Sequence, residues 1–182
     1  MTTAPGVGEI GLTGGCQCGA VRYRLDASPN GGFICHCRMC QKASGGPFSA
    51  FCGVPTASLV TTRGTVSTFQ SSDIAERGFC SACGTPLTYR MLGSQRVGIS
   101  ICTLDNPNAV IPKEQLGAES RVSWLAEGLA APEASLSDWL NGRHISSVGS
   151  RQHPDHEVAV LSPSGADASQ ILSDVFPRSS RR

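Results

Sequence analysis

Apolar and polar residues alternate in several short stretches of the chain, most clearly in GGCQCGAVRYRLD. There Val21, Tyr23 and Leu25 alternate with charged side chains, which predicts a strand with one buried face. The apolar runs SAFCGVP at 49–55 and RVGISICTLD at 96–105 predict two further strands. Turn-forming sequences such as SPNGG separate these stretches, so the pattern favours a mainly β domain built from many short strands.

Another pair of short strands is predicted in ASLVTTRGTVSTFQ, at 57–70. The two strands meet at Arg63, which precedes a glycine suited to a tight turn. We expect Leu59, Val66 and Phe69, among the apolar residues of this segment, to face the interior of the domain.

The end of the folded region is marked by SLSDWLNG, a short predicted helix with Ser135 as its N-cap and Gly142 as its stop. Beyond it, Ser, Pro, Gly, Asp and His mix without periodicity, which is typical of a disordered segment. We therefore divide the chain into a flexible leader at 1–13, a folded domain at 14–142 and a mostly disordered tail at 143–182.

Length and charge exclude some classes of function. The chain has 182 residues, the length of one domain with a tail, and a formal net charge of +1 from 15 Lys and Arg and 14 Asp and Glu. The basic residues are not clustered, so we expect no nucleic-acid partner. No apolar run approaches the roughly 20 residues of a membrane span, and the N-terminus shows no secretory signal. We therefore expect no membrane partner and a cytoplasmic location.

The nine cysteines need a reason other than disulfides, because the cytosol keeps thiols reduced and an odd number cannot pair completely. Seven of them form three groups along the sequence: Cys16 and Cys18; Cys35, Cys37 and Cys40; Cys80 and Cys83. Zinc takes four ligands in a tetrahedron, so the first and third groups together supply one closed site of four thiolates. Such a site would clamp the start of the domain to a distant segment.

The middle group, Cys35, Cys37 and Cys40, supplies three thiolates and leaves one position on a zinc ion open for water or substrate. Three thiolates leave the site with less negative charge than four do. Its metal would therefore stay more electrophilic, and it could hold a substrate thiol as a thiolate. Two alternatives remain open: a different division of the ligands between two zinc ions, and a redox role for Cys80 and Cys83.

We also predict the surroundings of four further residues near these groups. His36, between two cysteines, is expected to point away from the metal, either at the surface or in support of the ligands. Cys52 and Cys102 lie in apolar, strand-like contexts and are expected to be small buried side chains, although either could supply a fourth ligand. Arg77, just before the third group, is expected to hydrogen-bond to another loop rather than to a ligand.

Four segments resemble successive motifs of the glutathione-dependent formaldehyde-activating enzyme (GFA) family, which also includes the centromere protein V type. They are GGCQCGAVRY, CHCRMCQKASGGPF, FQSSDIAERGFCSACGTPLTY and TLDNP, and the resemblance runs from about Gly14 to Asn106. The resemblance implies an Mss4-like fold of antiparallel sheets clamped by a structural zinc, with short helical segments. It also implies that the first and third cysteine groups hold this zinc and that the middle group holds a catalytic zinc, giving two Zn²⁺ per chain.

The activity that the resemblance implies is carbon–sulfur lyase chemistry on a small-molecule thiol and aldehyde. Glutathione would be the co-substrate and would join formaldehyde as S-hydroxymethylglutathione. Arg38 and Lys42 flank the middle group and are candidates for contacts with the two carboxylates of glutathione, beside the alternative that they are solvated surface charges. The chain departs from the family at PKEQLGAES, where Gln115 and Gly117 replace a common His and Trp. If those residues shape the pocket, this departure indicates a different substrate or none.

A second class of function is a non-catalytic zinc-binding module for a protein or chromatin partner, as the centromere members of the family suggest. The expected sign of that class is a basic extension. The segment from Arg143 onward instead balances its arginines with acidic residues. We therefore favour the enzyme on the sequence alone.

Overall fold

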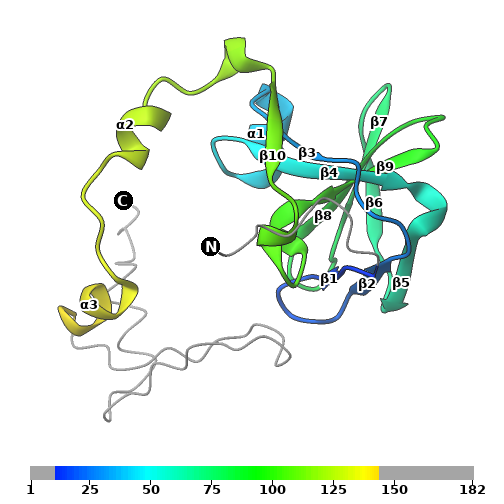
Figure 1. Ribbon diagram of the computed structural model, residues 1–182, viewed down its shortest axis with the longest axis horizontal. Coiled ribbons are helices and arrows are strands. Elements are labelled where there is room, and N and C mark those ends of the chain that lie inside the picture. Colours follow the sequence, from blue (N-terminus) through cyan, green and yellow to red (C-terminus); the bar gives the residue numbers. More distant parts are fainter. Residues whose placement is uncertain (1–10, 144–182) are drawn as a thin grey trace, which may run out of the picture. The chain divides into compact units, whose positions relative to one another are not determined.

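The structure of the chain, a computed structural model shown in Figure 1, describes residues 11–143. These residues belong to two compact units, 11–129 and 130–143. The predicted leader at 1–13 and the predicted tail at 143–182 lie almost entirely outside the described residues.

Two sheets form the larger unit, and the mainly β class predicted from the sequence is confirmed. The smaller sheet is antiparallel, with the order β1 (Thr13–Gly15), β2 (Arg22–Leu25), β5 (Leu59–Arg63). The larger sheet has seven strands, in the order β10 (Pro112–Leu116), β3 (Gly32–Cys35), β4 (Ser49–Pro55), β9 (Arg96–Ser100), β8 (Pro86–Met91), β7 (Ala75–Phe79), β6 (Ser67–Ser72). Its neighbouring strands are antiparallel except for β10 and β3, which run parallel.

The helices are all short. They are α1 (Arg38–Ser44), α2 (Leu125–Leu129) and α3 (Leu136–Asn141), with 3-10 turns at Thr56–Ser58, Ile101–Thr103, Pro107–Ala109 and Ala118–Ser120. The predicted helix near the end of the folded region is confirmed as α3. The Ser135 side chain accepts a hydrogen bond from the Asp138 amide at 3.0 Å, and Gly142 follows the last turn. Within the described part of the chain, no helix has the length and apolar character needed to cross a membrane.

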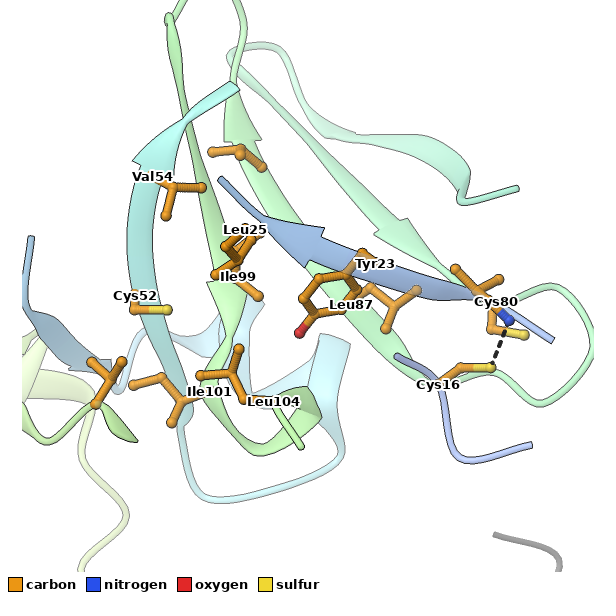
Figure 2. Close-up of a cluster of buried hydrophobic side chains, with 13 residues drawn as sticks. Cys16, Tyr23, Leu25, Cys52, Val54, Cys80, Leu87, Ile99, Ile101 and Leu104 are labelled. Carbon is orange, nitrogen blue, oxygen red and sulfur yellow. Dashed lines mark hydrogen bonds between the residues drawn. The ribbon is translucent and has the colours of Figure 1, made fainter. Parts of the chain in front are cut away.

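The apolar positions of the alternating sequence form the core of the larger unit. Val21, Tyr23 and Leu25, predicted to share one face, are all at most 3% exposed. The other members of the buried cluster are Cys16, Cys52, Val54, Cys80, Leu87, Val97, Ile99, Ile101, Leu104 and Val110. In Figure 2, Cys16 and Cys80 lie side by side at one end of this core. One of the cysteine groups is therefore anchored directly in the hydrophobic interior.

Two expectations about the burial of single residues were wrong. Phe69 was expected to face inward, but it is 49% exposed, because β6 is the edge strand of the larger sheet and lacks a neighbour to cover it. Cys102 was expected to be buried, but it lies exposed in a 3-10 turn, after the strand pattern has ended. Cys52, in contrast, is fully buried in β4 as expected.

Candidate metal centres

The first and third cysteine groups come together beyond the end of one strand from each sheet. Cys16 directly follows β1, and Cys80 directly follows β7. The four sulfur atoms of Cys16, Cys18, Cys80 and Cys83 all lie within 4.8 Å of one another. The Cys16 and Cys18 sulfurs are 3.5 Å apart, and the Cys18 and Cys80 sulfurs are 4.0 Å apart. The structure thus joins segments that are 62 residues apart in the chain, as the closed site requires.

Two tight turns aim these sulfur atoms at one point. Gly19 and Gly84 have φ of 75° and 77°, in the left-handed region that favours glycine, and each amide donates back to the carbonyl of the cysteine that starts its turn. The Val21 amide donates to the Cys16 sulfur at 3.2 Å, drawn as the dashed line in Figure 2. Backbone donors of this kind favour sulfur in its thiolate form.

The pKa values of the exposed pair show that the four thiols act on one another. A backbone hydrogen bond from Ala20 lowers the pKa of Cys18, but the neighbouring thiols outweigh it and raise that pKa to about 11. Desolvation raises the pKa of Cys83, but hydrogen bonds from Thr85 and its neighbours outweigh it and lower that pKa to about 6. Sulfur atoms this close do not carry four negative charges together unless a cation offsets them. The donor set and spacing therefore fit a tetrahedral zinc ion.

The middle cysteine group is built on an element that the sequence pattern did not reveal. Cys35 is the last residue of β3, Cys37 precedes the first turn of α1, and Cys40 lies within that helix. Their three sulfur atoms lie within 4.8 Å of one another, and no further His, Cys, Asp or Glu of residues 11–143 joins them. Three thiolates around one point fit a zinc ion that keeps one coordination position open.

The thiols of the middle group differ in how readily they ionise. Desolvation raises the pKa of Cys35 to about 12. Desolvation also raises the pKa of Cys37, but the backbone amides of Cys40 and Met39, at the start of α1, help to lower it below its usual value. An unpaired thiolate at Cys35 is therefore costly, and a bound cation would offset that cost.

Arg77 on β7 supplies a positive charge to the middle group. Its Nη2 donates to the Cys40 sulfur at 3.4 Å, although Arg77 was expected to contact a loop rather than a ligand. The guanidinium also stacks on the Tyr89 ring, with its carbon 5.0 Å from the ring centroid. Because Arg77 is 93% buried, this charge lies next to the sulfur atoms and not in bulk water.

His36 lies inside the protein, 1% exposed, and not at the surface. Its Nε2 lies 2.9 Å from Oε1 of Gln115, an oxygen that also accepts a hydrogen bond from Arg121. An amide oxygen only accepts, so Nε2 carries the proton and donates. The buried Nδ1 has no hydrogen-bond partner among the described residues. His36 therefore connects the middle cysteine group to β10.

Gly117, the second departure from the family pattern, touches the middle group through its backbone. It has φ of 64°, and a Cβ atom added there would lie 2.9 Å from the backbone nitrogen of Cys37. A tryptophan at this position would meet both the strained conformation and this clash. Gln115 and Gly117 are thus part of the local structure that carries Cys37.

Further polar contacts fix the backbone of the same loop. The hydroxyls of Ser44 and Ser49 both donate to the Cys40 carbonyl oxygen, each at 3.0 Å. The buried Gln41 side chain donates to the carbonyl oxygens of His36 at 2.8 Å and of Ser120 at 2.9 Å. These bonds tie both sides of α1 to the rest of the unit, so the three sulfur atoms are held by a supported loop.

Arg38 and Lys42, the candidates for contacts with glutathione carboxylates, are both exposed on α1. Arg38 donates to Oε1 of Gln41 at 2.9 Å, which orients its guanidinium along the helix. Their positions beside the middle group leave them open to solution.

A cavity of about 540 Å³ adjoins the middle group on the side of Arg77. Arg77, Ser44 and Ser49 line it, and each also contacts Cys40. Cys102 lines it too, together with a second cavity of about 450 Å³ that reaches Cys16. Sequence reasoning missed this arrangement, because Arg77, α1 and the turn at Cys102 come from three separate segments.

Comparison with known proteins gives three results. The family model described as glutathione-dependent formaldehyde-activating enzyme matches residues 11–120. An uncharacterized lyase from Schizosaccharomyces pombe is 34% identical over 76 residues, which are 42% of this chain and 55% of that protein. The match thus spans only about half the length of this curated relative. A crystal structure of a Rhodobacter sphaeroides protein superposes with a TM-score of 0.47 at 19% identity, covering 57% of this chain and 98% of that one.

Proposed function

This chain belongs to the glutathione-dependent formaldehyde-activating enzyme family, and we propose that it is a zinc-dependent carbon–sulfur lyase that forms or breaks a thiol–aldehyde adduct. The name of the Schizosaccharomyces pombe relative, an uncharacterized lyase, supports the reaction class. The proposed closed site is Cys16, Cys18, Cys80 and Cys83, and the proposed reactive site is Cys35, Cys37 and Cys40.

The observation that carries this proposal is the difference in ligand number between the two groups. Four sulfur atoms converge in one group and three in the other, where no further His, Cys, Asp or Glu from the described part of the chain approaches. A structural zinc site is closed, whereas a catalytic one keeps a position for water or substrate. The middle group has the second arrangement.

The reaction joins the sulfur of a thiol to the carbonyl carbon of an aldehyde, and the thiol proton ends on the former carbonyl oxygen. A zinc ion held by Cys35, Cys37 and Cys40 would supply Lewis acidity for this step. Arg77 donates a hydrogen bond to the Cys40 sulfur and places a positive charge beside the three thiolates. The serine hydroxyls at the Cys40 carbonyl keep that residue in place. In this proposal the preformed site would hold the two reactants close together and so raise their effective concentration.

The finer part of the proposal concerns the reactants and the compartment. Glutathione and formaldehyde are the first pair to test, with S-hydroxymethylglutathione as the adduct and with Arg38 and Lys42 as the proposed carboxylate contacts. We also propose a cytoplasmic location, because seven cysteines that serve as thiolate ligands need a reducing compartment. Both statements extend beyond the family membership on which they rest.

Exchange NMR on isotopically labelled formaldehyde tests the reaction. Glutathione is added with and without the zinc-loaded protein, and the exchange rate between free and adduct carbon is measured. We expect acceleration that is lost in Cys37→Ser and kept in Cys52→Ala, which removes a thiol outside both groups. Equal rates with and without protein, while two zinc ions remain bound per chain, would show that this pair is not the substrate.

A further inference from the structure

The cavity beside the middle cysteine group is mostly apolar, with aromatic side chains in its walls and several serine and threonine hydroxyls among them. Phe48, Phe51, Phe69 and Phe79 contribute to its walls, together with Pro86. Its volume of about 540 Å³ lies in the range that binds small organic molecules. Phe69 is 49% exposed on the edge strand β6, so an apolar molecule in the cavity would cover surface that water now contacts.

Arg77 is the charged side chain of this cavity, and among the described residues that line it there is no other. It lies where the cavity meets the middle group, since its Nη2 donates to the Cys40 sulfur. A guanidinium has five N–H donors, and one described hydrogen bond to sulfur leaves donors that suit an anionic oxygen. The cavity therefore matches a ligand with an apolar body and a single anionic group near its reactive end.

Neither reactant of the first test pair matches these walls. Glutathione carries two carboxylates and an ammonium group, and in this cavity only one of the carboxylates would find an opposite charge. Arg38 and Lys42 do not line the cavity, so the other charges of glutathione would meet only serine and threonine hydroxyls there, and burying them would be unfavourable. Formaldehyde, at the other extreme, has no side chain for the four phenyl rings to contact.

Building on the proposed lyase function, we propose that this cavity binds an aromatic or similarly bulky apolar group of the adduct, with at most one carboxylate, which would face Arg77. The apolar group can belong to the thiol half or to the aldehyde half, because the cavity is linked to the middle group through Arg77, which lines the cavity and contacts the Cys40 sulfur. Ser44 and Ser49 at the inner wall position Cys40, and Phe69 forms part of the outer wall.

Binding is tested separately from turnover, with 3-phenylpropionate as an unreactive probe of the zinc-loaded full chain. Cys102 is exposed and lines both this cavity and the second one, so its alkylation by iodoacetamide, followed on its own peptide by mass spectrometry, reports whether a probe fills either cavity. The Phe69→Ala variant, which alters this cavity alone, assigns the protection to it. A probe at ten times its Kd should slow this alkylation by about tenfold, because only the empty protein reacts. An equal concentration of 3-phenylpropylammonium should protect Cys102 far less, because its positive charge would lie beside the positive charge of Arg77.

A matched pair of variants assigns the binding to the aromatic wall. Phe69→Ala should weaken the protection by 3-phenylpropionate by about tenfold in Kd, because it removes apolar surface that the probe buries. Met91→Ala removes a side chain that is similarly exposed, at 50%, but does not line the cavity, and it should leave the Kd unchanged. Equal effects of the two variants, or no protection by the probe at any concentration, would overturn the inference.

Turnover then identifies the half that carries the apolar group. Glutathione or benzyl mercaptan is combined with formaldehyde or phenylacetaldehyde, and adduct exchange is measured for the four pairs. Faster exchange with benzyl mercaptan assigns the apolar group to the thiol, and faster exchange with phenylacetaldehyde assigns it to the aldehyde. Acceleration of the glutathione–formaldehyde pair alone, without protection by the probe, would overturn the inference and leave the lyase function intact. Protection without acceleration of any pair would support the cavity's ligand class and overturn the lyase function.

Discussion

The four-cysteine and three-cysteine groups differ in what holds their sulfur atoms in place. The four-cysteine group is set by tight turns at Gly19 and Gly84, and two of its members, Cys16 and Cys80, are part of the hydrophobic core. The three-cysteine group lies at the end of β3 and the start of α1, and side chains from β7 and β10 support it through Arg77 and Gln115. The first arrangement suits a structural site that joins distant segments of the fold, whereas the second suits a site in which three sulfur atoms leave one coordination position open.

The largest effect should follow from breaking the four-cysteine group. Cys16→Ser or Cys83→Ser should prevent stable folding, because a structural zinc contributes about 10 kcal/mol or more, comparable to the whole stability of a domain. Circular dichroism with thermal melting, together with the bound zinc per chain, measures this. Cys52→Ala, a cysteine outside both groups, is the control and should stay folded. A cooperative melt with one zinc still bound in Cys16→Ser would contradict the assignment of this group as the clamp.

Breaking the three-cysteine group should have a smaller effect on stability and a large one on activity. Cys37→Ser should leave a folded domain that binds one zinc fewer and no longer accelerates adduct exchange. We expect the domain to stay folded because Cys37 is partly exposed at the start of α1 and contributes little to the core. Unfolding of this variant would show that the structural and reactive roles assigned to the two groups are wrong.

The sequence predicted the grouping of the cysteines well because it depends on short-range spacing and on flanking turn glycines. The strand at Val21, Tyr23 and Leu25 was equally predictable, since period-two alternation directly reflects one buried face. The missed features were α1, only seven residues long, and β10, most of whose residues are exposed, because neither segment carries a clear periodic signal. The contacts of Arg77 and His36 depend on which strands become neighbours, and no local pattern encodes that.

The link between β10 and the three-cysteine group can be tested at Gln115. Gln115→Ala would leave Nε2 of the buried His36 without its partner, at an expected cost of about 1–3 kcal/mol. We expect the three-cysteine group to hold its zinc less tightly, measured by competition with a chelator, while the zinc of the four-cysteine group stays bound. Gln115→His, which restores the residue common in the family, offers an acceptor to the same nitrogen and should recover part of the loss. Equal zinc retention in all three proteins would show that β10 does not support the site.

The contact between Gly117 and Cys37 can be separated from ordinary backbone strain. Gly117→Ala and Gly93→Ala place a Cβ at similar positive φ, 64° and 77°, but only the first meets another residue, the backbone of Cys37. Both variants should lose about 1 kcal/mol of stability from the left-handed conformation. Gly117→Ala should lose about 1 kcal/mol more from overpacking, and it should hold the zinc of the three-cysteine group less tightly. Chemical denaturation measures the first quantity, and chelator competition measures the second.

The smallest perturbation uses the two cysteines that belong to neither group. Burial raises the pKa of Cys52 to about 11, and its side chain is 0% exposed, so it should react with alkylating reagents only when the domain opens. Cys102 is exposed and should react in the native protein. Because a thiol reacts as its thiolate, raising the pH from 7 to 9 still leaves Cys52 almost entirely protonated, and the reaction of this residue should remain negligible. Mass spectrometry of the two peptides follows both sites at once.

Removal of zinc with a chelator should then expose Cys52 as the clamp at Cys16, Cys18, Cys80 and Cys83 is lost. If Cys52 became reactive as soon as the more weakly held zinc of the three-cysteine group left, that group would be contributing to the fold, and the two groups would differ only in degree.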